Sequence, residues 1–189
     1  MEKQAIFDLC RDCAREVYGT RPPTAAYAER TARLLIGTAA TESHFQARRQ
    51  WGLKWDQDVG AWGLWQSEAI AMYDNIELLI NRRDVGQRTA EWIWGAGASY
   101  LVWRHMIPGR YSASDPLMRV LVRRLYAEDR FACAMARVHY LRDREPIPEG
   151  LREQAKYYKR VYNTPAGAGS VAKYLDDWRR HVAAVLGDA

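Results

Sequence analysis

Apolar residues recur at helical spacing through most of this chain, and this periodicity restricts its fold more than any other feature. Residues 2–18 alternate apolar and charged positions in this way before the breaker stretch "GTRPPT". The two-residue alternation that marks half-buried strands is nearly absent. The sequence therefore predicts a mostly α fold with one small β element. A chain of 189 residues can bury one sizeable core, so we expect a single domain over 1–189, with its motif-bearing core at about 24–186.

Capping signals delimit the predicted helices. Thr24 can cap one helix, and Ser170 can cap the last one. Asp115 followed by Pro116 is typical of an N-cap with proline at the first helical position. After residues 2–18, these signals and the periodicity predict helices at about 24–43, 67–80, 89–106, 115–142 (in one or two pieces), 149–162 and 171–186. The stretch 50–66, with glycines and aromatics but no helical period, predicts a loop with a short β-hairpin.

The chain is basic, with 28 Lys and Arg residues against 23 Asp and Glu residues. This balance fits a polyanionic partner, whether nucleic acid, anionic lipid or an acidic wall polymer. No helix-turn-helix or other reader motif is present, so nucleic acid is not the expected partner. A basic helical nucleic-acid binder remains a rival interpretation because of arginine doublets such as Arg123-Arg124.

Two features bear on cofactors and on location. Cys10 and Cys13 form a C-x-x-C inside a predicted helix rather than after a strand, which indicates packed, reduced thiols. No His/Cys/Asp cluster has metal-ligand spacing, so neither a metal nor a cofactor is expected. The N-terminus "MEKQAIFDLCRD" has no apolar h-region, and no run is apolar enough to span a bilayer. We therefore expect no signal peptide, no transmembrane segment and synthesis in a cytoplasm.

One carboxylate occupies a position where an apolar residue is expected. In "TAATESHF", residues 38–45, Glu42 shares a helical face with Leu35 and Ala39, at i+7 and i+3 from them. Burial against apolar neighbours would raise the pKa of this carboxyl group, and a carboxyl protonated near neutral pH can act as a general acid in glycosidic bond cleavage. The alternative is an exposed glutamate at a helix end.

The motifs around this glutamate form a pattern. Glu42 and Ser43 end the predicted helix, and "GAWGLWQ", residues 60–66, follows. This pair resembles the lytic transglycosylases of the goose-type and soluble-lytic-type lysozyme superfamily, in which a helix ends in Glu-Ser and a Gly-x-x-Gly-Leu-Met-Gln turn follows. Trp65 replaces the Met. The resemblance implies a lysozyme-like α+β fold, with the hairpin beside a cleft.

Two further motifs of that family have counterparts. "WIWGAGASYL" is similar to the third motif and contains Tyr100, although the Asn of that motif has no clear match. "VYNTPAGAGS" has the Tyr-Asn and Gly-rich layout of the fourth motif at Tyr162 and Asn163. In the family a tyrosine hydroxyl donates to the catalytic Glu. Tyr162 and Tyr140, in "ARVHYLR", both remain candidates for this role.

The resemblance implies roles for these residues. Glu42 would protonate the bridging oxygen of the glycan and then take a proton from the sugar's own 6-hydroxyl, closing a 1,6-anhydro ring. The candidate substrate contacts are Ser43, His44, Trp62, Gln66, Tyr100 and Asn163. Four tryptophans crowd one segment and are well placed to line a sugar cleft, with at least two of them expected in the core: Trp51, Trp55, Trp62 and Trp65.

Two alternatives stay open. Asp56, Asp58 or Glu68 could supply a second carboxylate, which would make the protein a hydrolytic muramidase. The chain could also be a non-catalytic virion or tail component with the same fold. The wider pattern is similar to small phage and prophage proteins with a transglycosylase-like domain. This implies peptidoglycan glycan strands as the partner, other virion or lysis proteins as further partners, and action at the cell wall or within a virion.

Overall fold

The computed structural model describes residues 2–46, 60–107, 109–110, 112, 115–163 and 167–187. The chain is mostly helical with a two-stranded antiparallel sheet, which confirms the predicted fold class. In order, the elements are α1 (Lys3–Glu16), α2 (Ala25–Ser43), β1 (Ala61–Trp62), β2 (Ser67–Glu68), α3 (Ala69–Asn81), α4 (Arg83–Trp94), the 3₁₀ helix η1 (Tyr100–His105), α5 (Pro116–Ala127), α6 (Asp129–Tyr140), α7 (Leu151–Val161), α8 (Val171–Asp177), the π-helix η2 (Trp178–Val182) and α9 (Ala183–Leu186).

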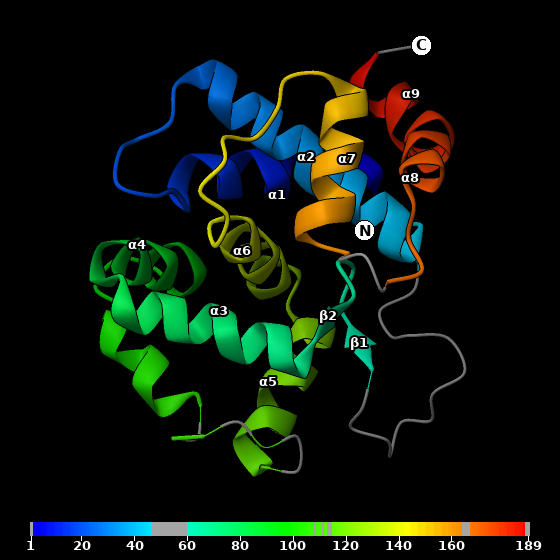
Figure 1. Cartoon of the computed structure of the whole chain (residues 1–189). Coiled ribbons are helices and arrows are strands. Elements are labelled where there is room, and N and C mark those ends of the chain that lie inside the picture. Colours follow the sequence, from blue (N-terminus) through cyan, green and yellow to red (C-terminus); the bar gives the residue numbers. More distant parts are fainter. Residues whose placement is uncertain are drawn as a thin grey trace.

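Helix α6 lies in the middle of the molecule (Figure 1). It contacts α1 and α2 on one side and α3, α4 and α5 on the other. Every residue from Phe131 to Val138 is buried, as is Tyr140. A helix that is buried on all sides is expected at the centre of a core, and short side chains such as Ala132 and Ala136 let its neighbours approach closely.

The second half of α2 is buried in the same way. Every residue from Leu34 to Thr41 is buried, and the hydroxyl groups of Thr38 and Thr41 donate to the carbonyls one turn earlier. The helix therefore has no solvent-facing stripe as it approaches Glu42. That residue is part-buried in the last turn.

The predicted caps are confirmed. Thr24 Oγ1 accepts from the backbone N–H of Tyr27, and Asp115 accepts from Leu117 N–H, with Pro116 at the start of α5. Ser170 likewise caps α8. Each cap depends on contacts within one helical turn, so sequence suffices to find it.

The helix predicted over 89–106 is wrong in its bounds. Helix α4 already begins at Arg83 and ends at Trp94, and η1 begins only at Tyr100. Gly95 and Gly97 separate the two, with φ angles of 97° and 91°, and a helix cannot continue through such a conformation. The stretch predicted over 115–142, in one or two pieces, forms two helices, α5 and α6.

The β element lies where the sequence placed a hairpin, although it ends later. Ala61 pairs with Glu68 and Trp62 with Ser67. Gly63, with φ at 76°, lies in the turn, and a Cβ there would be 2.5 Å from the Leu125 carbonyl oxygen of α5. The turn thus packs tightly on α5. Residues 47–59 of the predicted loop lie outside the described residues.

The cysteines are free and buried, as predicted for Cys10 and Cys13, and Cys133 of α6 is also free and buried.

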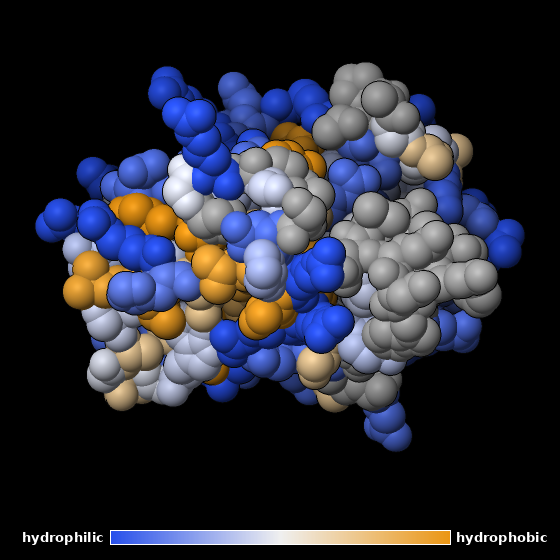
Figure 2. All heavy atoms as spheres, turned by 90° about the horizontal axis from the view of Figure 1, so that it is seen from below, coloured by the Kyte–Doolittle hydropathy of each residue, from blue (hydrophilic) through white to orange (hydrophobic). Residues whose placement is uncertain are grey.

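Seen from the side on which α5 lies in Figure 1, hydrophobic residues form a patch among hydrophilic ones (Figure 2). Two of the exposed large apolar residues, Leu117 and Val120, belong to α5.

Replacement of Gly37 tests the close packing of α2 against the C-terminal helices. An added Cβ would overlap the Tyr174 hydroxyl oxygen and lie 2.5 Å from Cζ of that ring. Gly37→Ala should therefore destabilise the protein by about 1–3 kcal/mol, although alanine is the better helix former. Urea denaturation measures the change. Gly109→Ala, where a Cβ meets nothing within 4 Å, should stay within about 0.5 kcal/mol. An unchanged or more stable Gly37→Ala protein would contradict this contact.

Candidate active site

An open cleft of about 1160 Å³ lies at the C-terminal end of α2. Its walls come from the last turn of α2, from β2 and the start of α3, from the end of α6, and from α7 and the start of α8. Glu42, Ser43, His44, Gln66, Tyr162 and Asn163 all line it. The fold thus brings together residues far apart in the sequence, such as Glu42 and Asn163, which are 121 positions apart.

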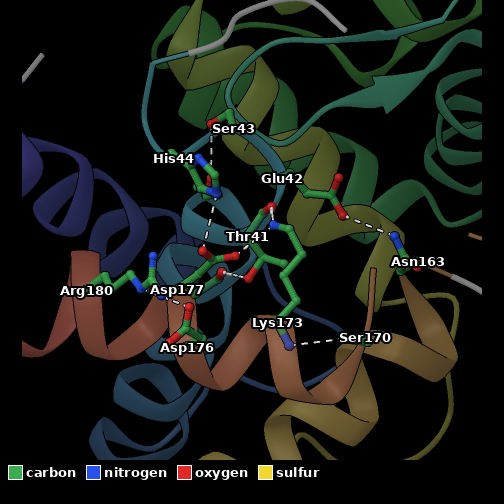
Figure 3. Close-up of polar contacts among 12 residues, drawn as sticks. Thr41, Glu42, Ser43, His44, Asn163, Ser170, Lys173, Asp176, Asp177 and Arg180 are labelled. Carbon is green, nitrogen blue, oxygen red and sulfur yellow. Dashed lines mark hydrogen bonds and ion pairs between the residues drawn. The ribbon is translucent and has the colours of Figure 1, made fainter. Parts of the chain in front are cut away.

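The Glu42 carboxyl group is held by two donors. Tyr158 Oη donates to Glu42 Oε1 at 2.6 Å, and Asn163 Nδ2 approaches the same oxygen at 3.5 Å. Figure 3 shows Asn163 directed at this carboxyl group from beyond the end of α7. Among the described residues, no hydrogen bond is made to Oε2. If the carboxyl group is protonated, its proton is placed on this oxygen, because Oε1 already accepts from Tyr158.

Burial raises the pKa of Glu42, and the negative charge of Glu68 adds to this effect. The hydrogen bonds from Tyr158 and Asn163 and the positive charge of Lys173 act in the opposite direction without cancelling it. The carboxyl group is thus set in an environment that disfavours its charged form.

The donor tyrosine is neither of the two candidates taken from the sequence. Tyr140 Oη makes a 2.7 Å hydrogen bond with Thr38 Oγ1 inside the core, and Tyr162 Oη donates to the Trp65 carbonyl at 2.8 Å. Tyr158 lies one helical turn before Tyr162 on the same face of α7. The Tyr-Asn motif lies at the end of α7, whereas helix packing directs the tyrosine one turn earlier at Glu42.

Asn163 has a defined amide orientation. Lys159 Nζ donates to Asn163 Oδ1 at 3.0 Å and to the Gly167 carbonyl at 2.8 Å. Because the amide oxygen accepts from the ammonium group, the amide nitrogen faces Glu42. Lys159 was not predicted, although its i, i+4 spacing to Asn163 is visible in the sequence.

The structure places three predicted substrate contacts on the cleft wall: Ser43, His44 and Gln66. Local hydrogen bonds occupy two of them. Ser43 Oγ donates to the Ala39 carbonyl at 2.9 Å, and Gln66 Nε2 donates to the Gly63 carbonyl at 2.8 Å. Both side chains therefore steady the backbone beside Glu42.

Two predicted substrate contacts, Trp62 and Tyr100, do not line the cleft. Trp62 and Trp65 lie in the core, which confirms the expectation that at least two of the four tryptophans pack there. Trp62 and Trp65 are 2% and 0% exposed, and Trp65 Nε1 donates to the Leu35 carbonyl at 2.9 Å. Tyr100 begins η1, with the Arg83 guanidinium 5.6 Å from its ring, and does not line the cleft. The tryptophans pack inward because the turn between β1 and β2 docks against α5. Of the other predicted aromatic lining, Trp51 and Trp55 lie outside the described residues.

Three acids were predicted as candidates for a second carboxylate. Of these, Glu68 lines the cleft, and its side chain is exposed. Asp56 and Asp58 lie outside the described residues. Two more acids line the cleft but are paired: Arg142 contacts Asp74 at 2.9 Å and Arg160 contacts Asp143 at 2.8 Å.

Beside the cleft the fold assembles a cluster that the sequence spacing did not indicate. His44 Nε2 is 3.2 Å from Asp177 Oδ1, and the His44 and His181 rings stack with centroids 5.1 Å apart. Asp177 and His181 are four residues apart, but His44 is far from both in the sequence.

Comparisons with protein-family models, with curated proteins and with solved structures find no match for this chain. Every helix in the described part of the chain is too short or too polar to span a lipid bilayer.

Proposed function

We propose that this protein cleaves the glycan strands of peptidoglycan as a lytic transglycosylase, with Glu42 as its general acid and base. The observation that carries the proposal is the part-buried Glu42 carboxyl group on the wall of an open cleft, held at one oxygen by Tyr158 and Asn163. The resemblance of the Glu42-Ser43 pair and the following turn to lytic transglycosylases supports it. The net charge of +5 suits an anionic wall.

In this mechanism Tyr158 and Asn163 fix Oε1, and Oε2 donates its proton to the bridging oxygen between two sugars. The bond from C1 to that oxygen breaks as positive charge develops on the ring, and the new carboxylate stabilises this charge. The carboxylate then takes the proton of the 6-hydroxyl as O6 bonds to C1. Glu42 ends protonated, and the product is a 1,6-anhydro sugar formed without water.

Hydrolysis is the second candidate, because Glu68 lines the same cleft as Glu42. A second carboxylate can activate a water molecule, which would then attack C1 and leave a reducing end.

Digestion of purified sacculi tests the proposal. We expect soluble muropeptides whose mass is lower by one water molecule than that of the hydrolytic products. Reducing ends in place of anhydro ends would favour the Glu68-assisted reaction. Release of no soluble product by a protein with a helical circular dichroism spectrum and cooperative unfolding would contradict both reactions.

The Tyr158 hydrogen bond is tested by Tyr158→Phe. Loss of a hydrogen bond to a group that gains charge during the reaction should lower kcat by about ten- to a hundredfold. The matched control is Tyr157→Phe on the same helix, whose hydroxyl donates to the Glu145 carbonyl at 3.3 Å. Rates of muropeptide release should change little in the control. Equal rates for both variants would remove Tyr158 from this role.

A further inference from the structure

The structure contains a cluster of potential metal ligands next to the cleft. It consists of His44 at the C-terminal cap of α2, Asp177 at the end of α8 and His181 within η2. One ligand atom from each residue can be chosen so that all of them lie within 4.8 Å of one another. Two imidazoles and a carboxylate are a donor set suited to zinc and related first-row transition metals, and unsuited to magnesium or calcium.

The distances are close to those of a coordination sphere. Zinc bonds to histidine nitrogen and carboxylate oxygen are about 2.0–2.2 Å long, so two ligands at a tetrahedral angle lie about 3.3–3.6 Å apart. The 3.2 Å from His44 Nε2 to Asp177 Oδ1 is close to the lower end of this range. His44 is exposed and His181 is half-buried, so a modest ring rotation can bring the second imidazole to the same point.

The neighbours of Asp177 prepare its carboxylate for this role. Lys173 Nζ donates to Asp177 Oδ2 at 2.7 Å and also to the Thr41 carbonyl. Oδ1, on the other side, faces His44 (Figure 3). Hydrogen bonds of this kind to the second oxygen are what orients a metal-bound carboxylate.

Positive charges close to the cluster disfavour binding of a divalent cation, but they leave the ligand atoms accessible. Lys3 and Arg180 act on His181 electrostatically. Arg180 Nε is paired with Asp176 Oδ2 at 2.8 Å, which partly neutralises its charge (Figure 3).

The backbone is distorted at both ends of the cluster. Residues 178–182 form a π-helix between two α-helical segments, and π-helical turns are frequent at functional sites. His44 has a φ of 51°, a left-handed conformation that few side chains adopt. These two features place the imidazoles against one another from separate parts of the chain.

We propose that His44, Asp177 and His181 bind one divalent transition-metal ion, with Zn²⁺ as the best match, and that a water molecule takes its fourth position. Such an ion would tie the end of α2, where Glu42 lies, to the C-terminal helices. This site does not depend on the proposed glycan cleavage.

The experiment titrates ZnCl₂ into the EDTA-treated, tag-free full chain by calorimetry, and repeats the titration with CoCl₂ by visible absorption. We expect one equivalent of Zn²⁺, Co²⁺ bands that Zn²⁺ abolishes, a higher unfolding midpoint with Zn²⁺, and no binding of Mg²⁺. His44→Ala and His181→Ala should each weaken Zn²⁺ binding by at least about tenfold. His105→Ala, in η1, should bind as the unmodified protein does.

Asp177→Asn adds a variant that keeps the size of the side chain while removing its charge, and it should also weaken binding. Metal-free unfolding midpoints establish that each variant is folded. Absence of saturable binding by the unmodified protein would overturn the proposal. Binding that is unchanged in both His44→Ala and His181→Ala would overturn it as well, because the metal would then be bound elsewhere.

Discussion

Glu42→Gln is expected to reduce muropeptide release from sacculi by at least about a hundredfold, because general acid and base catalysis of this kind contributes about 10²–10⁴ in rate. The amide fills the same space and can still accept the Tyr158 hydrogen bond, but it has no proton to transfer to the bridging oxygen. Product release is measured by chromatography and mass spectrometry of the soluble fraction.

The matched control for this substitution is Glu153→Gln on α7. Its side chain is 55% exposed and lies outside the cleft, so activity and stability should both change little. The Glu42→Gln protein should unfold cooperatively, at a midpoint equal to or above that of the unmodified protein, since a part-buried ionisable group is removed. Full activity of a folded Glu42→Gln protein would end the proposed mechanism.

Trp65→Ala is expected to destabilise the fold by about 3–5 kcal/mol, the largest stability change predicted for this chain. The ring is fully buried, and its Nε1 donates to the Leu35 carbonyl in α2. Substitution therefore leaves a cavity between the β turn and α2 and removes a buried hydrogen bond. Urea denaturation followed by circular dichroism measures the loss.

The comparison variant is Leu101→Ala, whose side chain is 46% exposed, and its cost should be well under that of Trp65→Ala. The two possible functions of Trp65 give opposite results. A core residue lowers the unfolding free energy when it is removed, whereas a cleft residue would leave stability unchanged and weaken glycan binding. The second result would place this tryptophan on the cleft wall rather than in the core.

Local signals in the sequence were enough to predict most of the helices and the side of its helix on which Glu42 lies. The Thr24, Asp115 and Ser170 caps act within one turn, and the spacing of Glu42 from Leu35 and Ala39 places it on the core-facing side of any regular helix. The bounds of α4 were missed, although Gly95 is a visible break. Gly95 and Gly97 adopt positive φ angles there and end the helix, and a glycine in the sequence does not by itself specify that conformation.

The helical class, the helix caps and the inward-turned carboxyl group follow from local patterns in the amino-acid sequence, because each depends on backbone geometry over a few residues. Three further contacts arise only from tertiary packing: Tyr158 donates to Glu42, Trp65 is buried in the core, and His44 lies beside Asp177. Each of these depends on how a helix or turn is rotated and packed against elements distant in the chain. Side-chain packing across the whole core sets those rotations, and no short stretch of sequence contains them.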